Sequence, residues 1–196
     1  MRAILLAAGL GTRLRPMTNT IPKCLVTIHG KPLLQIWLER LIDAGVGSFL
    51  INTHYLSEQV ETFVEKSEFR DHIELICEPE LLGTAGTLIR NSDFFKGEDG
   101  LLIHADNYCL SDLNAFINAH QRRPERCEMT MMTFRADEPS SCGIVKLDDD
   151  GVVTEFYEKI ETPPGNVANG AVYILSSELI NTINVDFSDV FDFSTE

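Results

Sequence analysis

RAILLAAGLGTRLRPMTNTIPK, residues 2–23, is the stretch that decides the fold of this chain. Its apolar run 3–7 predicts a strand buried on both faces of a sheet, and this strand leads directly into a loop that contains Gly9 and Gly11. No Asp or Glu precedes Glu39, although the whole chain carries a formal net charge of -14. A glycine-rich loop whose backbone N–H groups lie beside fixed cations suits a polyphosphate. The amino-terminal end therefore predicts a phosphate-binding loop.

The length and composition of the chain indicate one globular domain. Its 196 residues are 44% hydrophobic, and no apolar run approaches the roughly 20 residues that cross a bilayer. The start of the chain lacks a secretory pattern, so we expect a cytoplasmic protein without a membrane partner. The net negative charge argues against nucleic acid as a partner. The five cysteines form no C-x-x-C pair, which favours reduced thiols over disulfides or a structural zinc site.

The order of the expected elements is that of an α/β protein. We expect strands over residues 3–7, 48–53, 73–77 and 100–104, alternating with helices over 32–44, 57–66, 84–90 and 112–122. The expected helix caps are Ser57 for the second helix and Ser111 or Asp112 for the fourth. Beyond residue 123 we expect strands over 128–135, 143–147, 152–158 and 168–175, with a turn at 148–151.

This order predicts an α/β fold: a Rossmann-like, mostly parallel central sheet with helices on both faces and a β-rich second half. We interpret residues 1–196 as a single domain. Its nucleotide-binding half covers residues 1–122, and its second half covers residues 123–196.

Three interpretations of the glycine-rich loop compete. The dinucleotide fingerprint needs a third small residue, but Leu14 stands there, and the second expected strand ends at Asn52 and Thr53 without an acid. The P-loop motif is not supplied by Gly30-Lys31-Pro32. A plain turn would explain neither Arg13 nor the acid-free basic cluster. A different kind of nucleotide site is therefore indicated.

Residues 6–23 resemble the motif L-A-A-G-x-G-T-R-L-x-P-x-T-x-x-x-P-K of the sugar-1-phosphate nucleotidyltransferases, and most of all its mannose-1-phosphate guanylyltransferase-like members. The resemblance implies the nucleotide-diphospho-sugar transferase fold and a reaction that joins an NTP to a sugar 1-phosphate and releases pyrophosphate. It implies Arg13, Lys23 and Asp106 as catalytic residues. The implied nucleotide-binding residues are Leu6, Ala7, Ala8, Gly9, Gly11, Thr12, Arg13, Lys23, Glu78, Gly83, Thr84 and Ala85.

The same resemblance implies a metal site and a sugar-phosphate site. Asp106 follows the expected strand 100–104 and would bind Mg²⁺, the one cofactor expected. The implied sugar-phosphate residues are Asn107, Gly143, Glu158, Lys159 and Asn169. Cys142 stands where the family has an aromatic residue, so the sugar stays open, with a mannose-1-phosphate-like substrate favoured.

The chemistry of Glu78, which the resemblance places at the nucleobase of the NTP, indicates which base is bound. An ionised carboxylate accepts hydrogen bonds and donates none, so it suits the N–H donors of guanine and favours GTP. UTP, dTTP and CTP stay open. Because the attacking phosphate is already an anion, no protein base is expected, and His29, His54, His72 and His120 receive no role. His104 is left unassigned.

The carboxyl end raises a second interpretation. The family's D-x-G-T-like segment, which carries a second metal-binding Asp, is absent, and the nearby acids Asp186, Asp189 and Asp192 lie outside that motif. We expect either a truncated chain, an enzyme with one protein carboxylate on the metal, or impaired catalysis. The alternative function is a nucleotide- or nucleotide-sugar-binding regulatory protein. A homo-oligomer also remains open.

Overall fold

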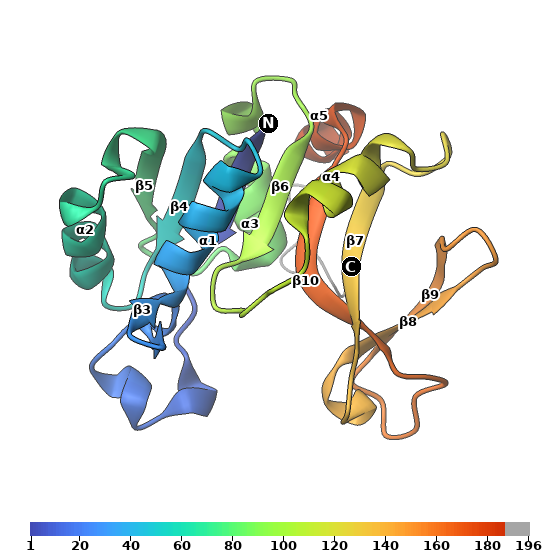
Figure 1. Cartoon of the computed structure of the whole chain (residues 1–196), viewed down its shortest axis with the longest axis horizontal. Helices are drawn as coiled ribbons and strands as arrows, with labels where there is room; N and C mark the ends of the chain where they lie inside the picture. Colours follow the sequence, from blue (N-terminus) through green and yellow to red (C-terminus); the bar gives the residue numbers. More distant parts are fainter. Residues whose placement is uncertain (187–196) are drawn as a thin grey trace.

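The computed structural model describes residues 1–186, which build a sheet with helices on both faces (Figure 1). The principal sheet has eight strands in the order β5-β4-β1-β6-β10-β8-β9, and β7 pairs with β10. Its strands are β1 (Arg2–Leu6), β4 (Phe49–Thr53), β5 (Ile73–Cys77), β6 (Gly100–His104), β7 (Met129–Arg135), β8 (Gly143–Leu147), β9 (Val153–Glu158) and β10 (Val167–Leu175). The helices are α1 (Leu33–Asp43), α2 (Ser57–Lys66), α3 (Gly83–Arg90), α4 (Leu113–Gln121) and α5 (Ser177–Asp186).

The strands of the first half run parallel to one another. β1 pairs with β4 on one side and β6 on the other, and β4 pairs with β5, all in parallel register. β1, β4 and β6 are short, mostly apolar and largely buried, as expected where helices cover both faces, whereas β5 is the more exposed edge strand. Their carboxyl ends lie at one edge of the sheet, where open α/β folds bind ligands. The α/β class predicted from the sequence is confirmed.

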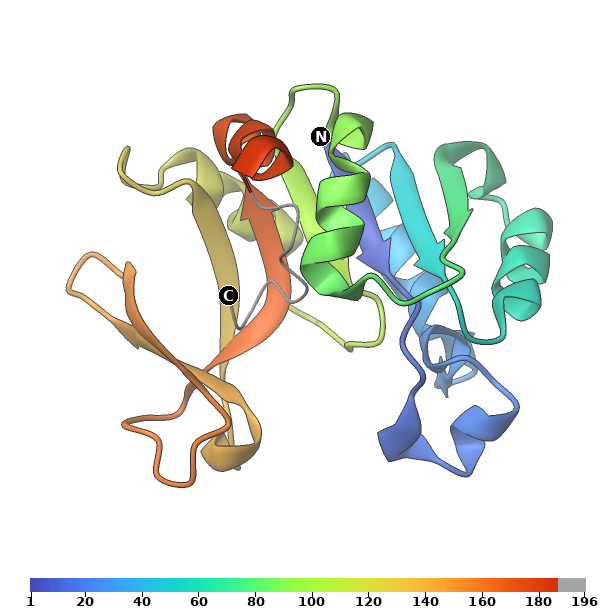
Figure 2. The same ribbon diagram turned by 180° about the vertical axis from the view of Figure 1, so that it is seen from behind.

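The second half extends the same sheet with antiparallel strands. β10 pairs antiparallel with β6, β7 and β8, and β8 pairs with β9. The register of β10 against β7 shifts between Asn169 and Tyr173, and Ala171 within this bulge has a φ of 53°. A bulge bends a strand and re-aims its side chains. Here it directs β10 from the parallel core to the second half, which Figure 2 shows from behind.

Two apolar clusters fill the two faces of the sheet. One cluster joins β1, β4 and β6 to α1 and α4, and it includes Trp37 and Leu113. The other joins the opposite face to α3 and α5, and it includes Leu88 and Ile180. The helices lie on opposite sides of the sheet in the two views (Figures 1 and 2). Among residues 1–186, no helix is long and apolar enough to cross a membrane.

Several local elements differ from the sequence-based prediction. Ser57 is the first residue of α2 and not its cap, because the preceding Leu56 takes the left-handed conformation with a φ of 53° and turns the chain into the helix. Asp112 is confirmed as the cap of α4, since its side chain accepts a hydrogen bond from the N–H of Ala115 at 3.1 Å. The prediction missed α5 and the small hairpin of β2 (Thr27–Ile28) and β3 (Lys31–Pro32). It also missed the six 3-10 turns among the described residues, at Thr12–Leu14, Met17–Asn19, Lys23–Leu25, Arg70–His72, Ser92–Phe95 and Pro139–Ser141. Asp189 and Asp192 lie outside the described residues.

His120 gives the fold a pH dependence. Its side chain is fully buried, its Nδ1 lies 2.8 Å from Thr130 Oγ1, and its Nε2 lies 3.3 Å from Asp99 Oδ2. Burial, assisted by the charge of Arg123, lowers the pKa of His120 below the usual 6.5, and this outweighs the opposing effect of Asp99 and Glu128. The unfolded chain therefore binds more protons at this site than the folded chain.

We expect the free energy of unfolding to fall as the pH drops below about 6.5, the pKa of histidine in the unfolded chain. Each unit by which the folded pKa lies lower contributes about 1.4 kcal/mol. Urea unfolding of the wild type and His120→Gln at pH 7.5 and pH 5 measures this. A pH dependence that is equal in both proteins would contradict the prediction.

Candidate functional site

A pocket of about 270 Å³ opens where the parallel strands end. The turn after β1, the end of β4 and the segments after β5 and β6 all contribute to its wall. The residues that line it are Leu6, Ala7, Ala8, Gly9, Lys23, Cys24, Asn52, Glu78, Leu81, Gly83, Thr84, His104 and Asp106. The topology alone brings these positions together, because the carboxyl ends of neighbouring parallel strands meet at one edge.

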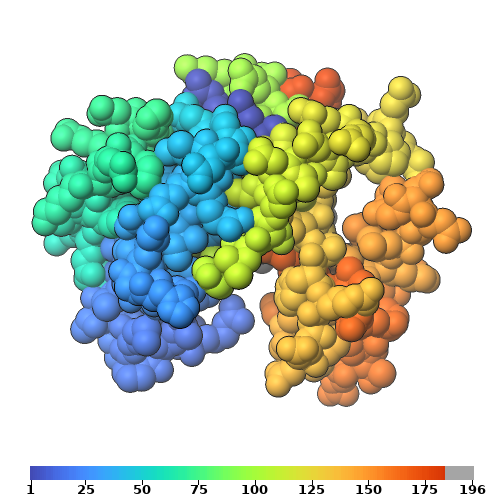
Figure 3. Space-filling view, viewed as in Figure 1, coloured from blue at the N-terminus to red at the C-terminus, as the bar shows by residue number. Residues whose placement is uncertain are grey.

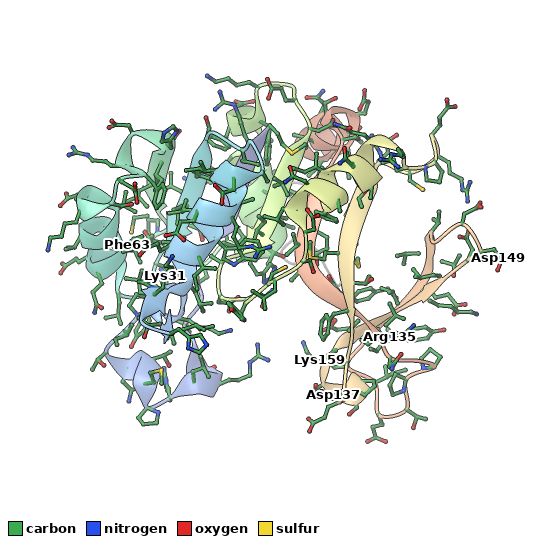
Figure 4. The ribbon with its side chains drawn as sticks, in the orientation of Figure 1. Lys31, Phe63, Arg135, Asp137, Asp149 and Lys159 are labelled. Carbon is green, nitrogen blue, oxygen red and sulfur yellow. The ribbon has the colours of Figure 1, made fainter. Side chains whose placement is uncertain are left out.

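A second, wider pocket of about 520 Å³ lies between the amino-terminal loop and the second half of the chain. Figure 3 shows this hollow between the blue and the orange parts of the surface. Arg13 and Lys23 line it from the first half, and Glu158, Lys159 and Asn169 line it from the second. Lys159 lies on the side of the second half that faces the amino-terminal loop (Figure 4).

The two pockets share Lys23, His104 and Asp106. Lys23 begins the third 3-10 turn, and its Nζ lies 2.5 Å from Asp106 Oδ2 just beyond β6. The two side chains are only 22% and 30% exposed, so their charges are partly shielded from water. A cation and a carboxylate thus stand side by side at the junction of two ligand-sized hollows. His104 at this junction was not assigned from the sequence, and only its place on the sheet edge could have indicated it.

The closed end of the first pocket contains a buried hydrogen-bond network around Glu78. Glu78 is 4% exposed, and its Oε1 accepts hydrogen bonds from Asn52 Nδ2 at 2.9 Å and Thr87 Oγ1 at 2.6 Å. Its Oε2 accepts from the backbone N–H of Leu82 at 3.3 Å. Asn52 also accepts from the N–H of Ala7 at 2.7 Å. Sequence reasoning missed Asn52 and Thr87, because neither belongs to a motif; an amide at the end of a buried strand was the one signal available.

The structure brings most of the expected nucleotide residues to the first pocket. Arg13 lines the second pocket instead, where it shares a wall with Lys23 and Asp106. Gly11 and Thr12 follow on the loop, outside the lining of either pocket, and Gly11 takes a φ of 61° while its carbonyl accepts a hydrogen bond from Thr18 Oγ1 at 2.7 Å. Ala85 is 2% exposed and packs into the core, so its side chain does not face the pocket.

All five expected sugar-phosphate residues line the second pocket. Asn107 donates from Nδ2 to the carbonyl of Gly170 at 3.0 Å and so connects the segment after β6 to β10. Asn169 is engaged within the bulge, where it accepts from the N–H of Ala171 at 2.8 Å and donates to Tyr173 Oη at 2.6 Å. These two hydrogen bonds within β10 hold the Asn169 side chain in the wall of the second pocket. Lys159 forms an ion pair with Glu158.

Cys24 faces the first pocket without the properties of a nucleophile. Burial raises the pKa of its thiol to about 12, and the nearby charge of Asp106 acts in the same direction. Only the thiolate is reactive, so the side chain stays a neutral thiol at physiological pH. Its raised pKa therefore argues against a nucleophilic role for this cysteine.

Trp37 provides an optical signal next to Asp106. It is the single tryptophan of the chain, it is 2% exposed, and its Nε1 donates to the carbonyl of Asn107 at 2.9 Å. Because Asn107 directly follows Asp106, we expect a ligand that binds Asp106 to alter this peptide group and hence the environment of the indole. We expect a saturable change of tryptophan emission when GTP and Mg²⁺ are titrated into the protein. Asp106→Asn should shift the midpoint to about tenfold higher ligand concentration. Calorimetric GTP binding without any change in emission would contradict this.

Comparison with known proteins now identifies the class. The model of the nucleotidyl transferase family matches residues 2–190, so the chain belongs to that family. Mannose-1-phosphate guanylyltransferase catalytic subunit beta of Drosophila pseudoobscura pseudoobscura is 33% identical over 188 residues, which cover 94% of this chain and 50% of that protein. Mannose-1-phosphate guanylyltransferase 1 of Arabidopsis thaliana is 32% identical over 194 residues, with 94% and 52% covered. The chain spans about half the length of the curated relatives it matches.

A solved structure agrees with this assignment. HddC from Yersinia pseudotuberculosis, crystallised in complex with GMP-PN, superposes with a TM-score of 0.81 at 28% identity. The match covers 100% of this chain and 84% of that one. The predicted family and fold are therefore confirmed.

Proposed function

We propose that this chain carries out, in the cytoplasm, the transfer of a nucleotidyl group from an NTP to a sugar 1-phosphate, with GTP and a mannose-1-phosphate-like sugar favoured. Two pockets that meet at the Lys23–Asp106 pair support this most strongly. A reaction between two phosphorylated substrates needs two adjacent binding hollows with charge neutralisation between them. In this proposal residues 1–122 bind the nucleotide, residues 123–196 bind the sugar phosphate, and 1–196 form a single domain.

The chemistry requires positioning more than covalent help. The phosphate of the sugar 1-phosphate attacks the α-phosphorus of the NTP, the bond from that phosphorus to the β-phosphate bridging oxygen breaks, and pyrophosphate leaves with the electron pair. Lys23 at the junction neutralises negative charge as the two phosphates approach. Arg13 neutralises the β- and γ-phosphates of the NTP, and Lys159 holds the sugar phosphate. The backbone of Ala8 and Gly9 approaches the nucleotide phosphates in the first pocket.

Asp106 has the properties of a protein ligand for Mg²⁺. It is a partly exposed carboxylate where both phosphates would meet, and Mg²⁺ usually takes one or two carboxylates together with phosphate oxygens and waters. Within residues 1–186, no group of three or more His, Cys, Asp or Glu could hold a metal by itself. When bound, Mg²⁺ supplies charge neutralisation to the phosphates. In the free protein Lys23 Nζ lies 2.5 Å from Oδ2 of Asp106, so Lys23 and the metal would neutralise charge at the same carboxylate.

Pyrophosphate release tests the proposal. The protein is incubated with Mg²⁺, with GTP, UTP, dTTP or CTP, and with a panel of sugar 1-phosphates, and an EDTA control removes the metal. We expect release with GTP and a mannose-1-phosphate-like sugar, and its loss with EDTA. Turnover with UTP or dTTP alone would reassign the base. NTP binding without release for every pair would support a regulatory binding protein instead.

A further inference from the structure

Glu78 is a buried carboxylate that is held by neutral donors alone. Within the part of the chain that the structure describes, no cation forms an ion pair with it, and its partners are an amide, a hydroxyl and a backbone N–H. An ionised group removed from water is costly unless hydrogen bonds replace its hydration. The donors at Oε1 therefore fix the orientation of this side chain in the wall of the first pocket.

Asn52 is the side chain through which this arrangement is tied to the rest of the site. It is 3% exposed, and its amide accepts from Ala7 N–H while it donates to Glu78 Oε1 and reaches Thr87 Oγ1 at 3.2 Å. One planar group thus joins the turn after β1, the segment after β5 and helix α3. A primary amide can donate and accept at once, whereas Asp at this position could only accept and Leu could do neither.

Thr87 completes the support without touching the pocket. It is fully buried in α3, it donates to Glu78 Oε1 at 2.6 Å, and its hydroxyl also lies 2.9 Å from the carbonyl of Gly83. With two partners on Oε1, Glu78 retains acceptor capacity at Oε2, which accepts from the N–H of Leu82 at the longer distance of 3.3 Å. Leu6 and Leu81 contribute apolar lining to the pocket. Such a site favours a flat ring with N–H donors on its edge.

We infer that Asn52, together with Thr87, is a positioning residue for base selection: it holds Glu78 so that the first pocket prefers a nucleobase with adjacent N–H donors to one with a carbonyl acceptor at that edge. This inference rests on the proposed function, since it requires that the first pocket bind the base of an NTP. Neither side chain needs to touch the reacting atoms.

The test measures selectivity in binding, without sugar 1-phosphate and therefore without turnover. Dissociation constants for GTP, ITP, UTP and inorganic tripolyphosphate are determined by calorimetry on the wild type, Asn52→Leu, Thr87→Val and Thr87→Ser. Asn114→Leu, on the exposed face of α4, is the matched control. GTP presents two N–H donor groups, ITP presents one of them, and UTP presents a carbonyl beside its N–H.

We expect the wild type to bind GTP most tightly. Asn52→Leu and Thr87→Val should each reduce the GTP-to-UTP affinity ratio about tenfold, the effect of one charge-assisted hydrogen bond. Thr87→Ser, which keeps the hydroxyl, and Asn114→Leu should retain the wild-type ratio. Tripolyphosphate affinity should stay unchanged in Thr87→Val, because the loss lies at the base and not at the phosphates.

Failure of the inference and failure of the proposed function give different results. A wild type that binds none of the NTPs would overturn the function, and the inference with it. A wild type that prefers GTP, with folded Asn52→Leu and Thr87→Val proteins that keep that preference, would overturn only the inference. If Asn52→Leu does not fold, the Thr87→Val and Thr87→Ser pair decides, and equal selectivity in that pair counts against the inference.

Discussion

Lys23→Met is expected to lower the rate of pyrophosphate release about 10³-fold, because it removes the cation at the junction of the two pockets. Lys23 lines both pockets and lies 2.5 Å from Asp106. Loss of one well-placed charge-stabilising group in phosphoryl-transfer and related sites costs about 10² to 10⁵ in rate. Methionine keeps most of the side-chain length, so the loss reflects the charge. Steady-state kinetics with GTP and mannose 1-phosphate measure the effect.

The fold should survive this substitution. A partly exposed ion pair contributes at most about 1 kcal/mol to stability, so the unfolding midpoint should change little. Lys31→Met is the matched control, since Lys31 pairs with Glu39 at 2.6 Å away from both pockets (Figure 4). If Lys23→Met and Lys31→Met turn over at similar rates, Lys23 has no role in the reaction.

Gly100→Ala should destabilise the fold by about 3 kcal/mol, at the upper end of the usual cost of overpacking a core. Gly100 begins β6, and a Cβ built there would lie 2.1 Å from two ring carbons of Phe95. Phe95 is fully buried in the apolar cluster that contains Leu88 and Ile180, so its ring is surrounded by other core side chains. Urea unfolding gives the difference in the free energy of unfolding.

Gly47→Ala serves as the comparison for this loss. A Cβ at Gly47 would meet nothing within 4 Å, so this variant should be within about 0.5 kcal/mol of the wild type. The double variant Gly100→Ala with Phe95→Leu should recover part of the stability, because the smaller side chain leaves the space that the methyl group needs. Equal stability of Gly100→Ala and Gly47→Ala would refute the steric explanation.

The regular elements and the loop chemistry could be predicted from local sequence. β6 and β8 were predicted at the same bounds that the structure has, because each is a short apolar run limited by clear turn signals. The cap at Asp112 could be predicted for the same reason, because its side chain accepts from a backbone N–H only three residues further along the chain. By contrast, α5 was missed, since its apolar positions pack against α3 and the far face of the sheet, which the local pattern does not reveal.

The candidate site was predictable where residues belong to one motif, and less so where distant segments meet. Glu78 was expected to face a base, but its network with Asn52 and Thr87 spans 26 and 9 residues of sequence. Arg13 is grouped with the phosphate loop by its motif, and the structure places it in the 3-10 turn Thr12–Leu14 and in the lining of the second pocket. Asn169 lines the second pocket as expected, and in the free chain its amide also accepts from the N–H of Ala171 and donates to Tyr173 Oη. Its contact with a sugar stays a prediction.

The sequence by itself determined the alternation of strands and helices, the acid-free glycine loop and the presence of Lys23 and Asp106. Only the tertiary structure decided that Lys23 and Asp106, which are 83 residues apart, form one ion pair between two hollows. The reason is physical: periodicity and turn chemistry act over a few residues, whereas the parallel sheet brings the ends of β1, β4, β5 and β6 to a single edge. Which charges meet there depends on strand order and register, and these follow from burial of the whole sheet between its helices.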